Sequence, residues 1–122
     1  MSDLNNSLNT SITVVQGCLI VTLPNEMTDK DIESGSNRVL MKAKNSYIKG
    51  TIFDLSIVSV LDLYSFEALK KASKAISLMG IMVVWIGLRP GVVSALLDLD
   101  VDVGCVKTAM NLEQGLKMIS SK

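Results

Sequence analysis

The chain has 122 residues, of which 48% are apolar and 20% are charged, so it can form one domain with a buried core. Its 12 basic and 12 acidic residues cancel, which excludes the strong positive charge by which many proteins hold nucleic acid. The chain contains no histidine, which excludes Ser-His-Asp catalysis and removes the commonest metal ligand. We therefore expect a protein that is not an enzyme and that carries no metal or other cofactor.

Cysteine use and hydropathy indicate a cytoplasmic protein. Cys18 and Cys105 fit no CxxC spacing and each lies among apolar residues, so both are expected to be reduced core residues. Residues 2–7 are polar, unlike a secretion signal, and no apolar run approaches the roughly 20 residues of a membrane helix. We therefore expect neither a membrane nor a nucleic acid as partner.

The N-terminal residues 1–11 are rich in Asn and Ser, and we expect a flexible arm there, in front of one domain over 12–120. Two apolar runs follow, at 12–15 and 18–23, and both are typical of strands. The turn residues Gln16-Gly17 separate them by two residues, so the two strands are predicted to form an antiparallel hairpin.

A first helix is predicted over 28–47, where apolar residues recur at near-helical spacing. Thr28 and Asp31 resemble a capping box, although Asp stands in place of the preferred Glu. The segment 33–37, Glu-Ser-Gly-Ser-Asn, is a poor helix former, so the first turns are expected to be weak or kinked.

Strands and helices alternate in the rest of the chain. The helix predicted from Tyr64 to Met79 carries Lys70, Lys71 and Lys74 largely on the face opposite its apolar side. In chain order the predicted elements are a buried strand at 51–55, a connection at 56–61 with a β-like run at 58–60, a helix from Tyr64 to Met79, a buried strand at 81–86, a short helix from Val92 to Leu97 or Leu99 with Pro90 in its first turn, an edge strand at Cys105-Val106, and a final helix capped by Asn111 and weakened by Gly115. The order β-β-α-β-α-β-α-β-α predicts an α/β fold with a mixed, partly parallel sheet, an N-terminal hairpin and right-handed crossovers.

The stretch 52–66 joins the end of a buried strand to the start of an amphipathic helix, and it carries two carboxylates among serines. Sites in α/β sheets form where strands end and helices begin. Asp54 is expected at the strand exit, where its carboxylate can bond backbone N–H groups of the following loop. Asp62 fits a helix N-cap whatever the function, so capping alone is an alternative to a binding role.

Several stretches resemble one family in their order and spacing. Phe53-Asp54-Leu55-Ser56, a hydrophobic connection and then Asp62 at a helix start are similar to the STAS domain, the family of the bacterial anti-sigma factor antagonists. Residues 87–92, Gly-Leu-Arg-Pro-Gly-Val, resemble the family's Gly-x-x-Pro loop. Residues 108–116, Thr-Ala-Met-Asn-Leu-Glu-Gln-Gly-Leu, are similar to the tail of stressosome-type antagonists. The resemblance covers about residues 12–120, and the stressosome scaffold branch is the nearest fit.

The resemblance implies a non-catalytic protein of bacterial signal transduction in the stress response. Members of the family act by partner switching: they bind a switch serine/threonine kinase or an anti-sigma factor, or join other STAS proteins in a stressosome. In the family a Ser or Thr directly after the helix-start Asp is phosphorylated, but here Leu63 follows Asp62. The switch is therefore lost, or the phosphorylated residue is Ser65 or Ser59 instead.

The contact surface is expected at the junction 59–66, where Leu63 and Tyr64 add apolar surface that suits a protein contact. Zero net charge also favours self-association, at least as a homodimer. The alternative is a nucleotide- or small-anion-binding sensor module, in which Arg89 and adjacent backbone N–H groups hold the anion. The residues predicted to bind a partner are Ser59, Asp62, Leu63, Tyr64, Ser65 and Arg89.

Overall fold

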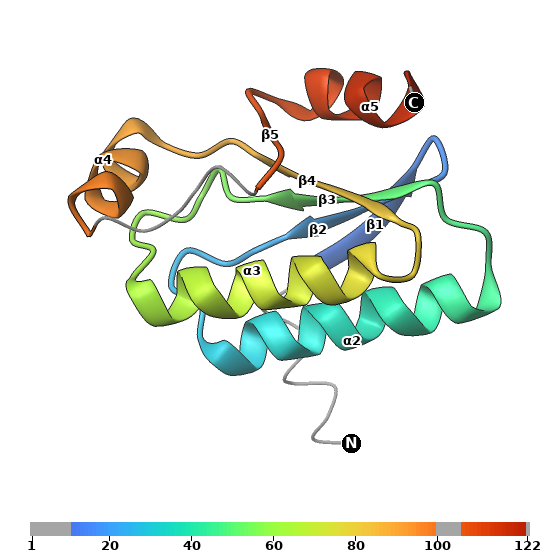
Figure 1. Cartoon of the computed structure of the whole chain (residues 1–122), viewed down its shortest axis with the longest axis horizontal. Coiled ribbons are helices and arrows are strands. Elements are labelled where there is room, and N and C mark those ends of the chain that lie inside the picture. The colour runs from blue at the N-terminus through green and yellow to red at the C-terminus, as the bar shows by residue number, and fades with distance from the viewer. Residues whose placement is uncertain (1–10, 100–105, 122) are drawn as a thin grey trace.

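A computed structural model describes residues 11–99 and 106–121, which form one five-stranded sheet with helices on both faces (Figure 1). The strands lie in the order β1-β2-β3-β4-β5, and β1 is antiparallel to β2 while the other pairs are parallel. The predicted α/β fold and element order are confirmed. The elements are β1 (Ser11–Val15), β2 (Cys18–Thr22), α2 (Asp29–Asn45), β3 (Gly50–Asp54), α3 (Leu63–Ser77), β4 (Met82–Ile86), α4 (Pro90–Asp98), β5 (Thr108–Ala109) and α5 (Leu112–Ser120).

The helices divide between the two faces of the sheet. Figure 1 shows α2 and α3 side by side under one face, α5 over the other, and α4 beyond the carboxyl ends of the strands. Consecutive strand residues point to opposite faces, so a sheet covered on both sides has strands that are apolar almost throughout. Accordingly Phe53 packs in the larger core under α2 and α3, whereas its neighbour Ile52 packs in the smaller core under α5. No helix within residues 11–99 and 106–121 is long and apolar enough to cross a membrane.

Helix α2 is continuous from Asp29 to Asn45, so it ends two residues before the predicted Tyr47, and a weak first turn stays a prediction. Its capping box is complete: Thr28 Oγ1 accepts from the backbone N–H of Asp31 at 3.2 Å, and Asp31 Oδ2 accepts from the N–H of Thr28 at 2.9 Å. Ile32 is buried in the core one turn later. The cap and the buried face therefore outweigh the low helix propensity of the segment.

The edge strand lies later than predicted. Val106 is in a bend and Cys105 is outside the described residues, whereas β5 consists of Thr108 and Ala109. The apolar side chain of Val106 packs against the larger core from that bend, so its hydropathy reflects core packing and not a strand. The pair at 105–106 is therefore corrected to a two-residue strand further along the chain.

Helix α5 begins as predicted, because Asn111 Oδ1 accepts from the N–H of Gln114 at 2.9 Å. That Gly115 weakens this helix stays a prediction, and the residue also has a packing role. A Cβ at this position would lie 3.1 Å from Cγ2 of Ile86 and 3.2 Å from Cδ1 of Ile52. Glycine therefore lets α5 lie close against β3 and β4.

Cys18 lies in β2 as a buried free thiol, which confirms the prediction for this residue. Burial raises the pKa of the Cys18 thiol, and the nearby charge of Lys49 acts in the opposite direction. The thiol is therefore protonated and inert at neutral pH. Cys105 lies outside the described residues, so its reduced state stays a prediction.

Candidate functional site

The junction between β3 and α3 starts with a tight turn at the strand exit. Asp54 Oδ1 accepts from the backbone N–H of Ser56 at 2.9 Å, which confirms the predicted role of this carboxylate. The N–H of Leu55 donates to the carbonyl of Ile86 at 2.9 Å, and the N–H of Val58 donates to the carbonyl of Leu55 at 3.0 Å. The turn is therefore tied to the neighbouring strand before the chain leaves the sheet.

Three buried side chains anchor the connection. Leu55, Val58 and Leu61 are between 0% and 3% exposed, and they occur at every third residue. The intervening Val60 is 71% exposed. The predicted β-like run at 58–60 belongs to no strand. Val58 and Val60 would share one face of a strand, but here they lie in a loop, where Val58 is buried and Val60 is exposed.

Ser59 is hydrogen-bonded to Asn25, which is not among the predicted site residues. Its hydroxyl donates to Oδ1 of Asn25 at 2.6 Å, and its backbone N–H donates to the same atom at 3.2 Å. Asn25 lies in the loop between β2 and α2, so this pair joins two loops at the same end of the sheet. Asn is common in the turn after a strand, so Asn25 has an ordinary local explanation. No sequence pattern indicates that it bonds to Ser59, 34 residues away.

Asp62 is the N-cap of α3, as the sequence suggested. Its Oδ1 accepts from the backbone N–H of Ser65 at 2.8 Å, and its carbonyl accepts from the N–H of Phe66 at 2.9 Å. Leu63 is therefore the first residue of the helix. The cap fixes the backbone that carries the side chain at this position.

The junction exposes large apolar side chains. Leu63 is 41% exposed and Tyr64 is 79% exposed, next to the exposed Val60. Ser59 and Asp62 are also at the surface, whereas Ser65 is only 7% exposed. Five of the six predicted partner-binding residues thus lie in one continuous stretch, but Ser65 contributes little to its surface.

Arg89 contacts the start of this junction. Its Nε donates to the carbonyl of Ser56 at 3.0 Å, and Pro90 occupies the first turn of α4 as predicted. The approach depends on Gly87, which has a φ of +75°. A Cβ at Gly87 would lie 2.9 Å from Cβ of Ser56, so the two loops meet only because this residue is glycine.

The polar groups of the junction are used for structure. The carboxylates of Asp54 and Asp62 and the amide oxygen of Asn25 each accept a backbone N–H of a serine. Within the described ranges, no group of three or more Cys, Asp or Glu side chains could hold a metal ion. The junction therefore offers a fixed, partly apolar surface for binding, and its carboxylates already have partners.

Comparison with known proteins finds a family and several structures that share this fold. The family model of the STAS domain matches residues 9–114. The structure is similar to that of a variant of RsbS from Moorella thermoacetica, with a TM-score of 0.76 and 25% identity over 92% of this chain and 95% of that one.

Two further structures share the fold. A chain in the molecular architecture of the stressosome, described as a signal integration and transduction hub, has a TM-score of 0.76 at 24% identity, over 91% of this chain and 96% of that chain. The unphosphorylated anti-sigma factor antagonist SpoIIAA of Bacillus has a TM-score of 0.69 at 10% identity, over 93% of this chain and 97% of that one. Among curated proteins, no sequence matches the chain.

Proposed function

The chain belongs to the STAS domain family, and we propose that it is a non-catalytic anti-sigma factor antagonist or stressosome-type scaffold protein. In this proposal a switch kinase or an anti-sigma factor binds at the junction 59–66. The family and the similarity to RsbS and to a stressosome chain support this class of function. The same comparisons support a cytoplasmic protein of bacterial signalling as part of the proposal.

The observation that carries the proposal is the exposed apolar cluster of Val60, Leu63 and Tyr64 on a fixed backbone. Burying one such side chain in an interface contributes about 1.5–3 kcal/mol. The backbone beneath them is already held by Asp62 and Asn25, so little ordering entropy is lost on binding. This combination suits the contact of a preformed surface with a protein partner.

The residue after the N-cap is central to how such a surface could be switched. A phosphate carries nearly two negative charges, which a helix N-terminus tolerates but an apolar partner surface does not. Leu63 occupies this position and has no hydroxyl. We therefore propose that the usual switch is absent, so that the protein stays in one binding state.

Ser65 and Ser59 remain the alternative phosphorylation sites. Ser65 is 7% exposed, so a kinase would have to open the first turn of α3 to reach its hydroxyl. Ser59 is exposed, although its hydroxyl is bonded to Asn25. Incubation with the switch kinase of the same organism and ATP, followed by intact-mass analysis, tests the proposal. No added phosphate is expected, and a phosphate mapped to either serine contradicts the lost switch.

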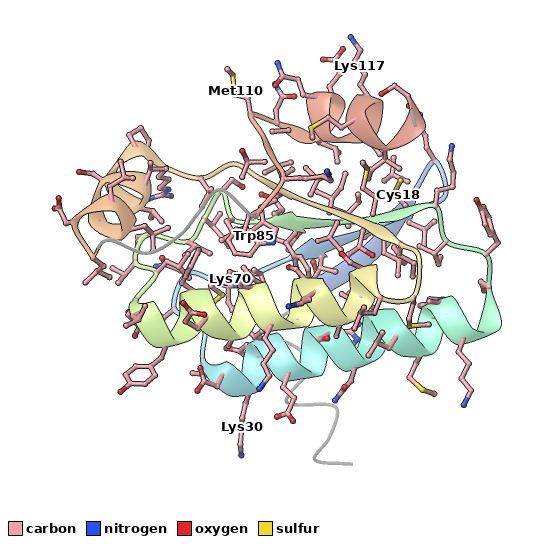
Figure 2. The ribbon with its side chains drawn as sticks, viewed as in Figure 1. Cys18, Lys30, Lys70, Trp85, Met110 and Lys117 are labelled. Atoms are coloured by element: carbon pink, nitrogen blue, oxygen red, sulfur yellow. The ribbon has the colours of Figure 1, made fainter. Side chains whose placement is uncertain are left out.

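Binding is tested by capture of the switch kinase or the anti-sigma factor. Tyr64→Glu places a charge in the apolar cluster and should weaken capture at least about tenfold, while the melting temperature stays near that of the wild type. Met110→Glu is the matched control, because Met110 is 74% exposed but lies by α5 (Figure 2). Equal capture by the two variants would show that the junction is not part of the interface.

The alternative sensor function centres on Arg89. Its Nε bond to Ser56 accounts for the residue without an anion, so the geometry favours it less. A nucleotide present at one hundred times its dissociation constant would add about 2.7 kcal/mol of stability. No thermal shift with any nucleotide would therefore exclude this function.

Self-association is the remaining part of the proposal. Ile57 in the connection after β3, Val60 in the junction 59–66 and Leu97 of α4 are large apolar side chains that are at least 47% exposed. Exposed apolar surface on a chain with no net charge favours a homodimer or a larger assembly with other STAS proteins. Mass photometry of the purified chain over a concentration series tests it, and a monomer throughout contradicts it.

A further inference from the structure

Among the described residues, the edge of the sheet beside β4 is paired over only part of its length. Strand β4 runs from Met82 to Ile86, but β5 pairs with Trp85 and Ile86 alone. Among the residues that the structure describes, the first three residues of β4 have no strand on this side. An unpaired edge of this kind can accept an added strand from another chain.

The hydrogen bonds show which backbone groups face the open edge. The N–H of Trp85 donates to the carbonyl of Lys107, on the β5 side, whereas the carbonyl of Ile86 accepts from Leu55, on the β3 side. Successive residues of a strand direct their backbone groups alternately to the two sides. Val83 lies two residues before Trp85, so its N–H and C=O point to the open edge.

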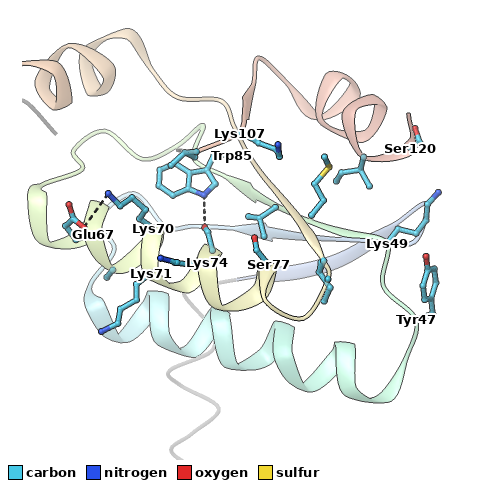
Figure 3. A pocket seen from close by; sticks show the side chains of 18 residues that line it. Tyr47, Lys49, Glu67, Lys70, Lys71, Lys74, Ser77, Trp85, Lys107 and Ser120 are labelled. Atoms are coloured by element: carbon cyan, nitrogen blue, oxygen red, sulfur yellow. Dashed lines mark hydrogen bonds and ion pairs between the residues drawn. The ribbon is translucent and has the colours of Figure 1, made fainter. Parts of the chain in front are cut away.

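A groove runs along this edge. It has a volume of about 1470 Å³, and Figure 3 shows its side chains spread between α3 and the C-terminal end of α5. The floor includes Val83 and Trp85, the α3 side includes Ser73, and the α5 side includes Ile119. Helices that cover the two faces of the sheet thus leave a gap at its edge, where the next strand would lie.

The groove is basic although the chain as a whole is neutral. In the part of the chain that the structure describes, one acidic side chain lines it, and that residue, Glu67, forms an ion pair with Lys70 at 3.8 Å. Among the described residues, the other lysines of the groove have no ion-pair partner. The lysines that line it are Lys49, Lys70, Lys71, Lys74 and Lys107.

These lysines are not placed like those that protect an edge strand from aggregation. Protective lysines stand on the edge strand itself. Here they come from the loop before β3, from α3 and from the residue before β5, and β4 itself has no lysine. In Figure 3, Lys74 and Lys107 lie on opposite sides of the β4 edge. The charge therefore surrounds the vacant strand position instead of blocking it.

We propose that this groove binds an extended acidic segment of a partner protein, which adds to the sheet as a strand beside Met82–Val84. The segment pairs with the backbone of Val83, and its alternating side chains face Lys74 on one side and Lys107 on the other. The site is separate from the junction 59–66 and does not depend on the function proposed for it.

The test uses a fluorescent synthetic peptide of alternating valine and glutamate and measures its anisotropy with the full chain. Binding is expected at low salt and should weaken as salt is added. Lys74→Glu and Lys107→Glu should each weaken binding at least about tenfold. Lys30→Glu is the matched control, because Lys30 is exposed on α2 and points away from the sheet (Figure 2). No binding of the peptide, or equal loss in the control, overturns the proposal.

Two modified peptides separate strand addition from simple charge attraction. Each is N-methylated at alternate residues, one at the odd positions and the other at the even positions. A strand added to β4 uses only one set of amides, so one peptide should lose binding at least about tenfold and the other should keep it. Equal binding of both peptides, equal binding of a glutamine version, or capture of an oligonucleotide but not of the peptide would each overturn the proposal.

Discussion

The β3–α3 junction and the groove beside β4 present opposite kinds of surface to a partner. At the junction, side-chain oxygens of Asp54, Asn25 and Asp62 accept the backbone N–H groups of three serines, and the exposed side chains beside them are largely apolar. In the groove, the first three residues of β4 lack a strand neighbour on the β5 side among the described residues, and lysines surround them. Exposed apolar side chains favour recognition by apolar contact, whereas an open edge favours recognition by strand pairing and charge.

The largest expected effect comes from the residue that supports both surfaces. Phe66 is fully buried in the first turn of α3, and its ring packs edge-on against Trp85 with centroids 5.8 Å apart. Phe66→Ala should lower the free energy of unfolding by about 3–5 kcal/mol and disturb both surfaces. Urea denaturation measures this, with the exposed Tyr64→Ala as control, expected within about 0.5 kcal/mol of the wild type. Similar midpoints for the two variants would show that Phe66 does not join the surfaces.

A smaller effect is expected at the glycine that brings α4 to the junction. Gly87→Ala should destabilise by about 2 kcal/mol, because its φ of +75° disfavours a side chain and its Cβ would meet Ser56 at 2.9 Å. Gly91→Ala is the control, because a Cβ there has open space and α4 would gain helix propensity. Thermal denaturation should show a lower melting temperature only for the first variant. A lower melting temperature in both variants would contradict the explanation from the φ of Gly87 and its contact with Ser56.

The smallest stability effect separates the cap from the surface it supports. Asp62→Ala removes the acceptor of the Ser65 N–H and should cost about 1 kcal/mol, whereas Asp62→Asn should keep most of the cap. Chemical denaturation measures the difference between the two variants. If Asp62→Asn keeps stability but loses partner capture, the carboxylate contacts the partner directly. Equal destabilisation by both would contradict the capping geometry.

The fold and the junction could be predicted from the sequence because each depends on patterns within one short segment. Buried strands are continuous apolar runs, and Asp62 stands directly before an amphipathic pattern, where an N-cap is expected. The bond between Ser59 and Asn25 joins two loops and leaves no local pattern. Helix α2 forms from Asp29 although residues 33–37 have low helix propensity, because buried side chains such as Ile32 stabilise it.

The groove could not be predicted for a different reason. Lys70 and Lys74 read as the polar face of a helix, and Lys49 and Lys107 come from distant parts of the sequence. Their convergence depends on the shortness of β5, and a two-residue strand has no periodicity to detect. Sequence reasoning therefore finds a site built from one segment more readily than a site built at a sheet edge.

Hydrogen–deuterium exchange of the chain, with and without its switch kinase or anti-sigma factor, shows whether the partner binds at the junction 59–66. We expect the partner to slow exchange at residues 59–66, at the start of α3, while β4 and β5 keep the rates of the free chain. Slowed exchange confined to β4, β5 or α5, with residues 59–66 unchanged, would contradict the junction as the partner-binding surface.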